Sequence, residues 1–200
     1  MDIAVIALTF AAIFVVELPD KTFLATLVLS TKYRPLLVWI GVGLAFLVQT
    51  AVAVGLGTAA SLLPTDLVRS IAALLFLFGA VVLLREGLSH RNADPEAEGA
   101  EIAAKAKEAH GLKQVLACFL VLFAAEWGDL SQLLTISLVA RYEDPVSVFT
   151  GAFGALLAVS GLAVLVGRTL LRWIRLHVLH FIGAAACLIL GVVTIIEVLG

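Results

Sequence analysis

Two stretches of this chain decide its architecture: FVVELPDKTFLATLV at Phe14–Val28 and FAAEWGDLSQLLTIS at Phe123–Ser137. Each carries two acidic residues, three positions apart, inside a predominantly apolar run. Charged residues are rare inside long apolar segments, so the recurrence of the same acidic pattern indicates an internal repeat. Laid on each other, the stretches align Glu17 with Glu126 and Asp20 with Asp129.

The composition around these stretches is that of a membrane protein. Of 200 residues, 62% are hydrophobic and 14% are charged, and the mean hydropathy is +1.12, whereas soluble domains average about 45–50% and 25%. A soluble fold of this length cannot bury so much apolar surface, so we expect the chain to be embedded in a lipid bilayer. The net charge of −2 excludes a nucleic-acid-binding surface.

Both cysteines, Cys118 and Cys187, lie in apolar runs and predict small core residues rather than a disulfide.

The apolar segments are long enough for six membrane crossings, because a transmembrane helix needs roughly 20 apolar residues. We therefore predict an all-α membrane protein. The first apolar run lacks a basic leader and contains acidic residues, so we expect it to remain in the mature protein. The predicted crossings are Ile3–Ser30, Leu36–Leu56, Leu67–Leu84, Leu112–Ala140, Val146–Val166 and Val178–Leu199.

The repeat divides the chain into two units of three crossings. We predict a first repeat over residues 1–88, a charged cytoplasmic linker over 89–111 that is flexible or partly helical, and a second repeat over 112–200. Because three is odd, the second repeat enters the membrane inverted, as in many secondary transporters. Ten lysines and arginines fall in the first, third and fifth loops, against two on the other side. The positive-inside rule then places both termini outside the cytoplasm.

Each motif contains a residue that interrupts a helix. Pro19 has no backbone N–H to donate to the preceding turn, and its ring clashes with that turn. Gly128, the aligned residue of the second repeat, weakens a helix less strongly. We predict that the first helix of each repeat is broken or kinked at the motif, more gently in the second repeat.

The motif carboxylates are the candidate binding site. An ionised side chain at the bilayer centre costs roughly 2.5–3.5 kcal/mol, so four of them indicate a site that is paired, protonated or hydrated. Residues three apart share a helix face, and the two faces are predicted to meet where the inverted repeats join. Oxygen ligands suit hard cations such as Ca²⁺, Mg²⁺ or Mn²⁺. The predicted metal ligands are Glu17, Asp20, Thr22, Glu126, Asp129, Ser131 and Gln132.

Lys21 leaves a purely structural interpretation open for the first motif. Glu17 and Lys21 are four residues apart and would neutralise each other on one helix. That interpretation fails for the second motif, where Leu130 takes the place of the lysine. Lys21 is therefore a candidate modulator of the site's charge.

Three further polar residues lie inside apolar segments: Gln49, Thr50 and Ser160. Thr50 aligns with Ser160 when the repeats are superposed. Small hydroxyl side chains commonly bond back to carbonyls of their own helix, so we favour a structural role for them.

The paired motifs resemble the Glu-x-Gly-Asp-Lys/Arg-Ser/Thr signature of the second calcium:cation antiporter family, whose members include the Golgi manganese/calcium transporters. The resemblance covers essentially the whole chain. It implies a bacterial inner-membrane member with both halves fused, which exports Mn²⁺ or Ca²⁺ as substrate in exchange for protons, without a cofactor or enzymatic activity. Three positions depart from the signature or its symmetry: Pro19 replaces its glycine, Leu130 replaces its basic residue, and Phe23 stands where the second repeat has Gln132.

Other functions stay open at this stage. An exporter of another small solute would have the same architecture, and so would a cation-selective channel, since a fixed ring of carboxylates also selects cations. A more remote alternative is an intramembrane aspartyl protease, in which Asp20 and Asp129 would share a proton. The glutamate that accompanies each aspartate argues against it. Whether the protein forms a homodimer is also open.

Overall fold

The computed structural model describes residues 1–18, 20–62, 64–89, 95–106, 109–173 and 176–199. Within these ranges all regular structure is helical, as the composition predicts. The helices are α1 (Ile3–Glu17), α2 (Lys21–Lys32), α3 (Pro35–Ala60), α4 (Thr65–Ser89), α5 (Pro95–Ala104), α6 (Lys113–Ala125), α7 (Leu130–Tyr142), α8 (Pro145–Trp173) and α9 (Leu176–Leu199).

The first segment of each repeat is a bent pair of helices. α1 and α2 meet at 71°, and α6 and α7 meet at 72°. Each bent pair is apolar enough to count as one crossing, and α3, Ser70–Ser89 of α4 and Pro145–Leu165 of α8 are long enough to cross alone. When each bent pair is counted as one span, up to five of the six predicted crossings have the length and hydropathy of a membrane span. The sixth stays a prediction, because the described apolar part of α9, His180–Ile196, is shorter.

The break in the second repeat corrects one prediction. The sequence predicts a gentler break at Gly128 than at Pro19, whereas the two pairs bend by nearly the same angle. Gly128 adopts a φ of +80°, a left-handed conformation that glycine reaches without steric cost. The chain is therefore redirected sharply at Gly128, and α7 starts in a new direction. Pro19 itself lies outside the described residues.

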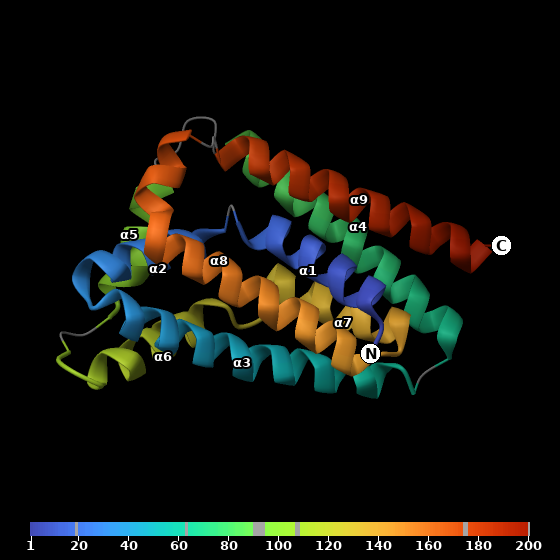
Figure 1. Ribbon diagram of the computed structural model, residues 1–200. Helices are drawn as coiled ribbons and strands as arrows, with labels where there is room; N and C mark the ends of the chain where they lie inside the picture. The colour runs from blue at the N-terminus through green and yellow to red at the C-terminus, as the bar shows by residue number, and fades with distance from the viewer. Residues whose placement is uncertain (19, 63, 90–94, 107–108, 174–175, 200) are drawn as a thin grey trace.

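The helices of the two repeats are interleaved. α1 packs along α8 and α3 packs along α6, so the first segment of each repeat contacts the second segment of the other. The last helices, α4 and α9, pack against each other. Figure 1 shows that α1 and α6 start at opposite ends of the bundle, and that both termini lie at the end away from α5. The repeats therefore run in opposite directions, as the inverted repeat predicts.

Two glycines at equivalent positions allow the interleaved helices to approach closely. A Cβ atom on Gly41 of α3 would lie 2.5 Å from the carbonyl oxygen of Val115 in α6. A Cβ atom on Gly151 of α8 would lie 2.6 Å from the carbonyl oxygen of Ile6 in α1. Both positions therefore require glycine, and the same close contact occurs twice, once for each repeat.

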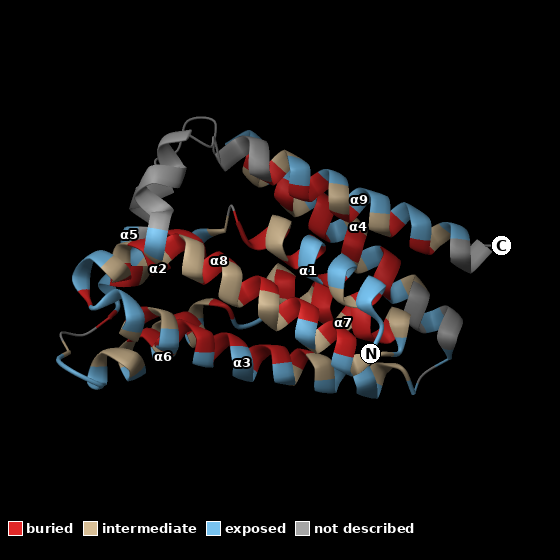
Figure 2. Cartoon of the chain, viewed as in Figure 1, coloured by how far each residue is buried: buried red, intermediate tan, exposed pale blue. Residues whose placement is uncertain are grey.

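Burial follows this interleaving. Buried residues lie on the sides of the helices that face each other, and exposed residues lie on the outer sides (Figure 2). Many of the exposed residues are large and apolar, such as Leu44, Leu74 and Leu188. An apolar outer surface of this kind would aggregate in water and is suited to contact with lipid. The buried polar residues near the helix breaks are Glu17, Thr22, Thr26, Glu126, Ser131 and Thr135.

The charged linker contains one described helix, α5. It packs along α2, and Ala103 near its end and Ala106 just beyond it are buried. The ammonium group of Lys32, the last residue of α2, donates to the Ala106 carbonyl oxygen at 2.9 Å. The linker is therefore partly helical and is attached to the second half of the first bent pair.

Candidate cation site between the two repeats

Each helix break forms a short turn that brings a glutamate and an aspartate together. The Asp20 N–H donates to the Glu17 carbonyl oxygen at 3.0 Å, and the Asp129 N–H donates to the Glu126 carbonyl oxygen at 3.1 Å. The prediction that each pair shares a helix face is wrong, because the helix is interrupted between its two members. The turns nevertheless place the acids of each motif side by side.

Each aspartate begins the helix that follows the break. Asp20 and Asp129 are N-cap residues with extended backbone, and they accept hydrogen bonds from the N–H groups of Thr22 at 3.0 Å and Ser131 at 3.3 Å. A cap of this kind satisfies an amide that has no partner within the helix, and the helix dipole favours negative charge at this end. This capping role is not among the roles predicted from the sequence. The signal for it is an aspartate directly after a proline or glycine and two residues before a threonine or serine.

Three carboxylates from both repeats converge at the breaks. Oxygen atoms of Glu17, Asp20 and Glu126 all lie within 4.8 Å of one another. The two glutamates are 1% and 2% exposed, and the Oε1 atom of each has no hydrogen-bond partner among the described residues. An ion placed in the plane of three such oxygens can lie within about 2.8 Å of all of them, close to the roughly 2.3–2.6 Å of calcium–oxygen bonds. The group needs little contraction to hold a divalent cation.

The hydroxyl groups of the motifs reach across between the repeats. The Ser131 hydroxyl contacts the Glu17 carboxylate, and the Thr22 hydroxyl contacts the Glu126 carboxylate. Thr22 also donates to the Asp20 carboxylate at 2.9 Å. Each glutamate therefore lies beside the aspartate of its own motif and the hydroxyl of the other. Five of the seven predicted ligands are brought to one place.

The remaining two predicted ligands lie outside the three-carboxylate group. Asp129 is half-buried, and its charge repels those of Glu17 and Asp20. It adds negative charge to the site, although its oxygens do not join the group. Gln132 accepts a hydrogen bond from the Gly128 N–H at 2.9 Å through its side-chain oxygen. The position of Gln132 indicates support of the helix break rather than direct contact with the three carboxylates.

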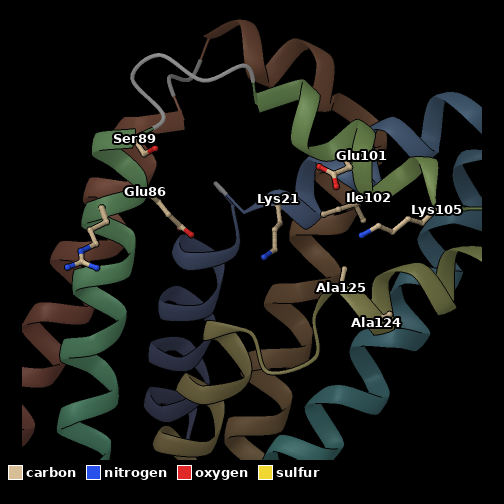
Figure 3. A pocket seen from close by; sticks show the side chains of 9 residues that line it. Lys21, Glu86, Ser89, Glu101, Ile102, Lys105, Ala124 and Ala125 are labelled. Atoms are coloured by element: carbon tan, nitrogen blue, oxygen red, sulfur yellow. The ribbon is translucent and has the colours of Figure 1, made fainter.

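A cavity of about 700 Å³ opens beside the first motif. The side chains of Lys21, Glu86 and Lys105 point into it from different parts of the chain (Figure 3). Lys21 is exposed there, and the acids that attract its ammonium group include Asp20 and Glu86. Lys21 therefore lies between the motif acids and the cavity, and a pair with Glu17 alone does not account for its position. The cavity is lined by Lys21, Arg85, Glu86, Ser89, Glu101, Ile102, Lys105, Ala124 and Ala125.

A second and much smaller cavity, of about 10 Å³, lies between α3, α7 and α8. Gln49 of α3 lines it, and its side-chain nitrogen donates to the Phe123 carbonyl oxygen at 2.9 Å. That carbonyl loses its helical partner because α6 ends at Ala125. Gln49 therefore satisfies the end of a helix in the other repeat. The repeat alignment contains a signal for this role, because it places the apolar Val159 at the position equivalent to Gln49. A polar residue that occurs in one repeat only indicates a role specific to that repeat.

Both halves of the chain match one family model, over residues 5–91 and 114–200. The model describes the divalent cation/proton antiporter GDT1. The chain belongs to the GDT1 family. The two matched ranges correspond to the two repeats and omit most of the linker. The resemblance indicated by the paired motifs is thereby confirmed. Because the family is one of transporters, the alternative of an intramembrane protease is not retained.

Several related proteins match most of the chain. Protein PAM71, a chloroplast protein of Arabidopsis thaliana, is 32% identical over 210 residues, which are 96% of this chain and 56% of that protein. The chloroplast GDT1-like protein 2 of Oryza sativa subsp. japonica is 30% identical, over 92% of this chain and 59% of its own length. The GDT1-like protein C17G8.08c of Schizosaccharomyces pombe is 27% identical, over 92% and 79%.

The chain therefore spans little more than half the length of these chloroplast relatives. No solved structure matches it. A bacterial origin and a location in the inner membrane remain predictions from the sequence.

Proposed function

We propose that this protein exchanges divalent cations, Mn²⁺ or Ca²⁺, for protons across a membrane. The observation that carries the proposal is the group of three carboxylates, Glu17, Asp20 and Glu126, which come from both repeats and lie within 4.8 Å of one another. Membership of the GDT1 family supports the same function, because the family model is that of a divalent cation/proton antiporter.

Proton exchange follows from the electrostatics of such a group. Two ionised carboxylates 4.8 Å apart repel each other by about 3.5 kcal/mol at an effective dielectric constant of 20. Burial adds a desolvation cost, so the empty site favours bound protons. A divalent cation supplies two positive charges and displaces these protons. Cation and protons therefore compete for the same oxygens, and competition combined with alternating access produces antiport.

We place the site near the middle of the membrane. Glu17 ends the 15 residues of α1, and the 12 residues of α2 follow the break. At 1.5 Å per residue, each arm of the bent pair covers roughly 20 Å. The four motif acids, with the hydroxyls of Thr22 and Ser131, would then share one buried volume where the inverted repeats meet.

The large cavity supplies a route to this site from the end of the bundle that carries α5. It holds both acidic and basic side chains and reaches Lys21, the residue next to Asp20. Ten of the basic residues belong to loops assigned to this end, so we propose that the cavity faces the cytoplasm. A proton gradient directed inward would then drive the cation outward.

The proposal is tested by reconstitution in liposomes that contain a pH-sensitive dye. Mn²⁺, Ca²⁺ and Mg²⁺ are added outside in turn, with the membrane potential held at zero by potassium and valinomycin. An antiporter releases protons from the lumen as the cation enters, so the lumen becomes alkaline. Cation entry without any change in luminal pH would indicate a channel, and a lack of cation entry would contradict the proposal altogether.

A further inference from the structure

The small cavity beside Glu126 is lined in part by two polar residues of α3, for which the site of the four motif acids has no role. We propose that Thr50 and Gln49 of α3, together with Glu126, form a second position for the transported cation, large enough for a single ion. This inference deepens the proposed function and rests on it. Neither α3 residue belongs to the repeated motifs.

Two buried oxygen atoms without partners point to an occupant. The Thr50 hydroxyl oxygen and the Glu126 Oε1 atom have no hydrogen-bond partner among the described residues. Thr50 is 3% exposed, Glu126 is 2% exposed, and both line the same cavity of about 10 Å³. Buried polar atoms are nearly always hydrogen-bonded, and leaving one unpaired is costly. The coincidence of two residues with such atoms at one cavity indicates that a polar species binds there.

The size and chemistry of the cavity suit a dehydrated cation. Its volume is close to that needed for one water-sized particle. Gln49 donates its side-chain nitrogen to the Phe123 carbonyl at 2.9 Å, and its amide oxygen takes no part in that hydrogen bond. The Thr135 hydroxyl donates to the Ser131 carbonyl at 2.8 Å and keeps its lone pairs. Oxygen ligands with a single carboxylate would bind a hard divalent cation weakly, as a position on a transport path requires.

The equivalent position in the other repeat is built differently. Ser160 of α8 aligns with Thr50, and its hydroxyl donates to the Leu157 carbonyl oxygen of its own helix at 3.1 Å. Val159 aligns with Gln49 and offers no polar atom. In the described part of the chain, the pair of polar residues is therefore present only on the Glu126 side. This asymmetry assigns the second position to one repeat and makes Ser160 a matched control.

The first test removes the Thr50 hydroxyl without changing the shape of the side chain. Thr50→Val, Thr50→Ser and Ser160→Ala are reconstituted in liposomes, and the KM of Mn²⁺ uptake is measured for each. We expect Thr50→Val to raise KM about tenfold, Thr50→Ser to restore it, and Ser160→Ala to leave it unchanged. A KM within twofold of wild type for Thr50→Val would overturn the proposal and would indicate that the cavity holds only water.

Melting temperatures separate this role from a structural one. An unpaired buried hydroxyl does not stabilise the empty protein, so Thr50→Val should melt at the same or a higher temperature without cation. Addition of MnCl₂ should raise its melting temperature less than that of wild type, because the stabilisation by a bound ligand increases with its affinity. A lower melting temperature without cation, combined with the wild-type response to MnCl₂, would show that the hydroxyl is structural and would refute the proposal.

A soft ligand at the same position gives an independent test. Thr50→Cys places a thiol in the cavity, and thiolates bind soft metal ions such as Cd²⁺. Cd²⁺ should inhibit Mn²⁺ uptake by Thr50→Cys at a concentration at least tenfold lower than for wild type or Ser160→Cys. Equal inhibition of all three proteins would count against the cavity as an ion position.

Failure of this inference is distinguishable from failure of the proposed function. If wild type shows no proton-coupled Mn²⁺ uptake, the proposed function fails. If wild type is active and Glu126→Gln is inactive, while Thr50→Val and Thr50→Cys behave as wild type, only the second ion position is refuted.

Discussion

Replacement of Glu126 by glutamine keeps the shape of the side chain and removes one of three converging carboxylates. When the cation displaces the protons of the empty site, the acids become ionised, and a divalent ion about 2.8 Å from the Glu126 oxygen is then attracted by about 12 kcal/mol at an effective dielectric constant of 20. The loss is partly offset, because Glu126 no longer repels its two neighbours, by about 3.5 kcal/mol each. The net loss of about 5 kcal/mol corresponds to an affinity lower by between roughly three and four orders of magnitude.

The assay is calorimetric titration of the detergent-solubilised protein with MnCl₂ at pH 8. Glu101→Gln is the matched control, because Glu101 lines the large cavity but lies outside the three-carboxylate group. It should retain the affinity of wild type within a few fold. Without cation, Glu126→Gln should melt at the same or a higher temperature than wild type, since the change relieves repulsion. If Glu126→Gln and Glu17→Gln both bind Mn²⁺ within tenfold of wild type, these glutamates do not hold the cation.

Gly41→Ala should destabilise the protein by about 1–3 kcal/mol through overpacking, since its Cβ would lie 2.5 Å from a backbone oxygen of α6. Gly55→Ala in the same helix, whose Cβ meets no atom of the described chain within 4 Å, should be neutral or stabilising in thermal melts. The pKa of Asp144 is lowered by hydrogen bonds from the Ser147 hydroxyl and N–H, so its stabilising contribution is complete at neutral pH and is lost as the pH falls below about 4. Asp144→Asn should therefore melt below wild type at pH 7, and the difference should shrink as the pH falls through that range; a constant difference would contradict this origin. An impermeant thiol reagent outside cells should label a cysteine introduced near either chain end and spare one near residue 100, and the opposite pattern would reverse the charge-based orientation.

The positions of the helices and of the site could be predicted because both depend on local sequence patterns. Apolar segments of fixed length and the repeated acids locate the crossings and place Glu17 and Glu126 at corresponding points. The repeat alignment also supplies the antiparallel arrangement of the two halves, since it follows from an odd number of crossings per repeat.

The details of the site could not be predicted in this way because they depend on contacts between distant residues. The approach of Glu17 to Ser131 joins two repeats more than a hundred residues apart. The hydrogen bond from Gln49 to Phe123 exists only because α6 ends at Ala125 and leaves a carbonyl free. The sharp bend at Gly128 depends on a backbone conformation that helix propensity does not describe. Asp129 has the same local sequence pattern as Asp20, yet only Asp20 joins the three-carboxylate group.

The interleaving of the repeats has a consequence for biosynthesis. When the first repeat leaves the ribosome, the partners that α1 and α3 need, α8 and α6, have not yet been made. The first three crossings can insert as helices, but the close contact at Gly41 and the surroundings of Glu17 and Asp20 have to wait for the second half. A membrane-embedded intermediate therefore precedes the folded protein during translation. In this intermediate, Glu17 and Asp20 lack the residues of the second repeat that surround them in the folded protein. The two repeats are separate in the sequence but fold as one unit, and the cation site forms only after the second repeat has been synthesised.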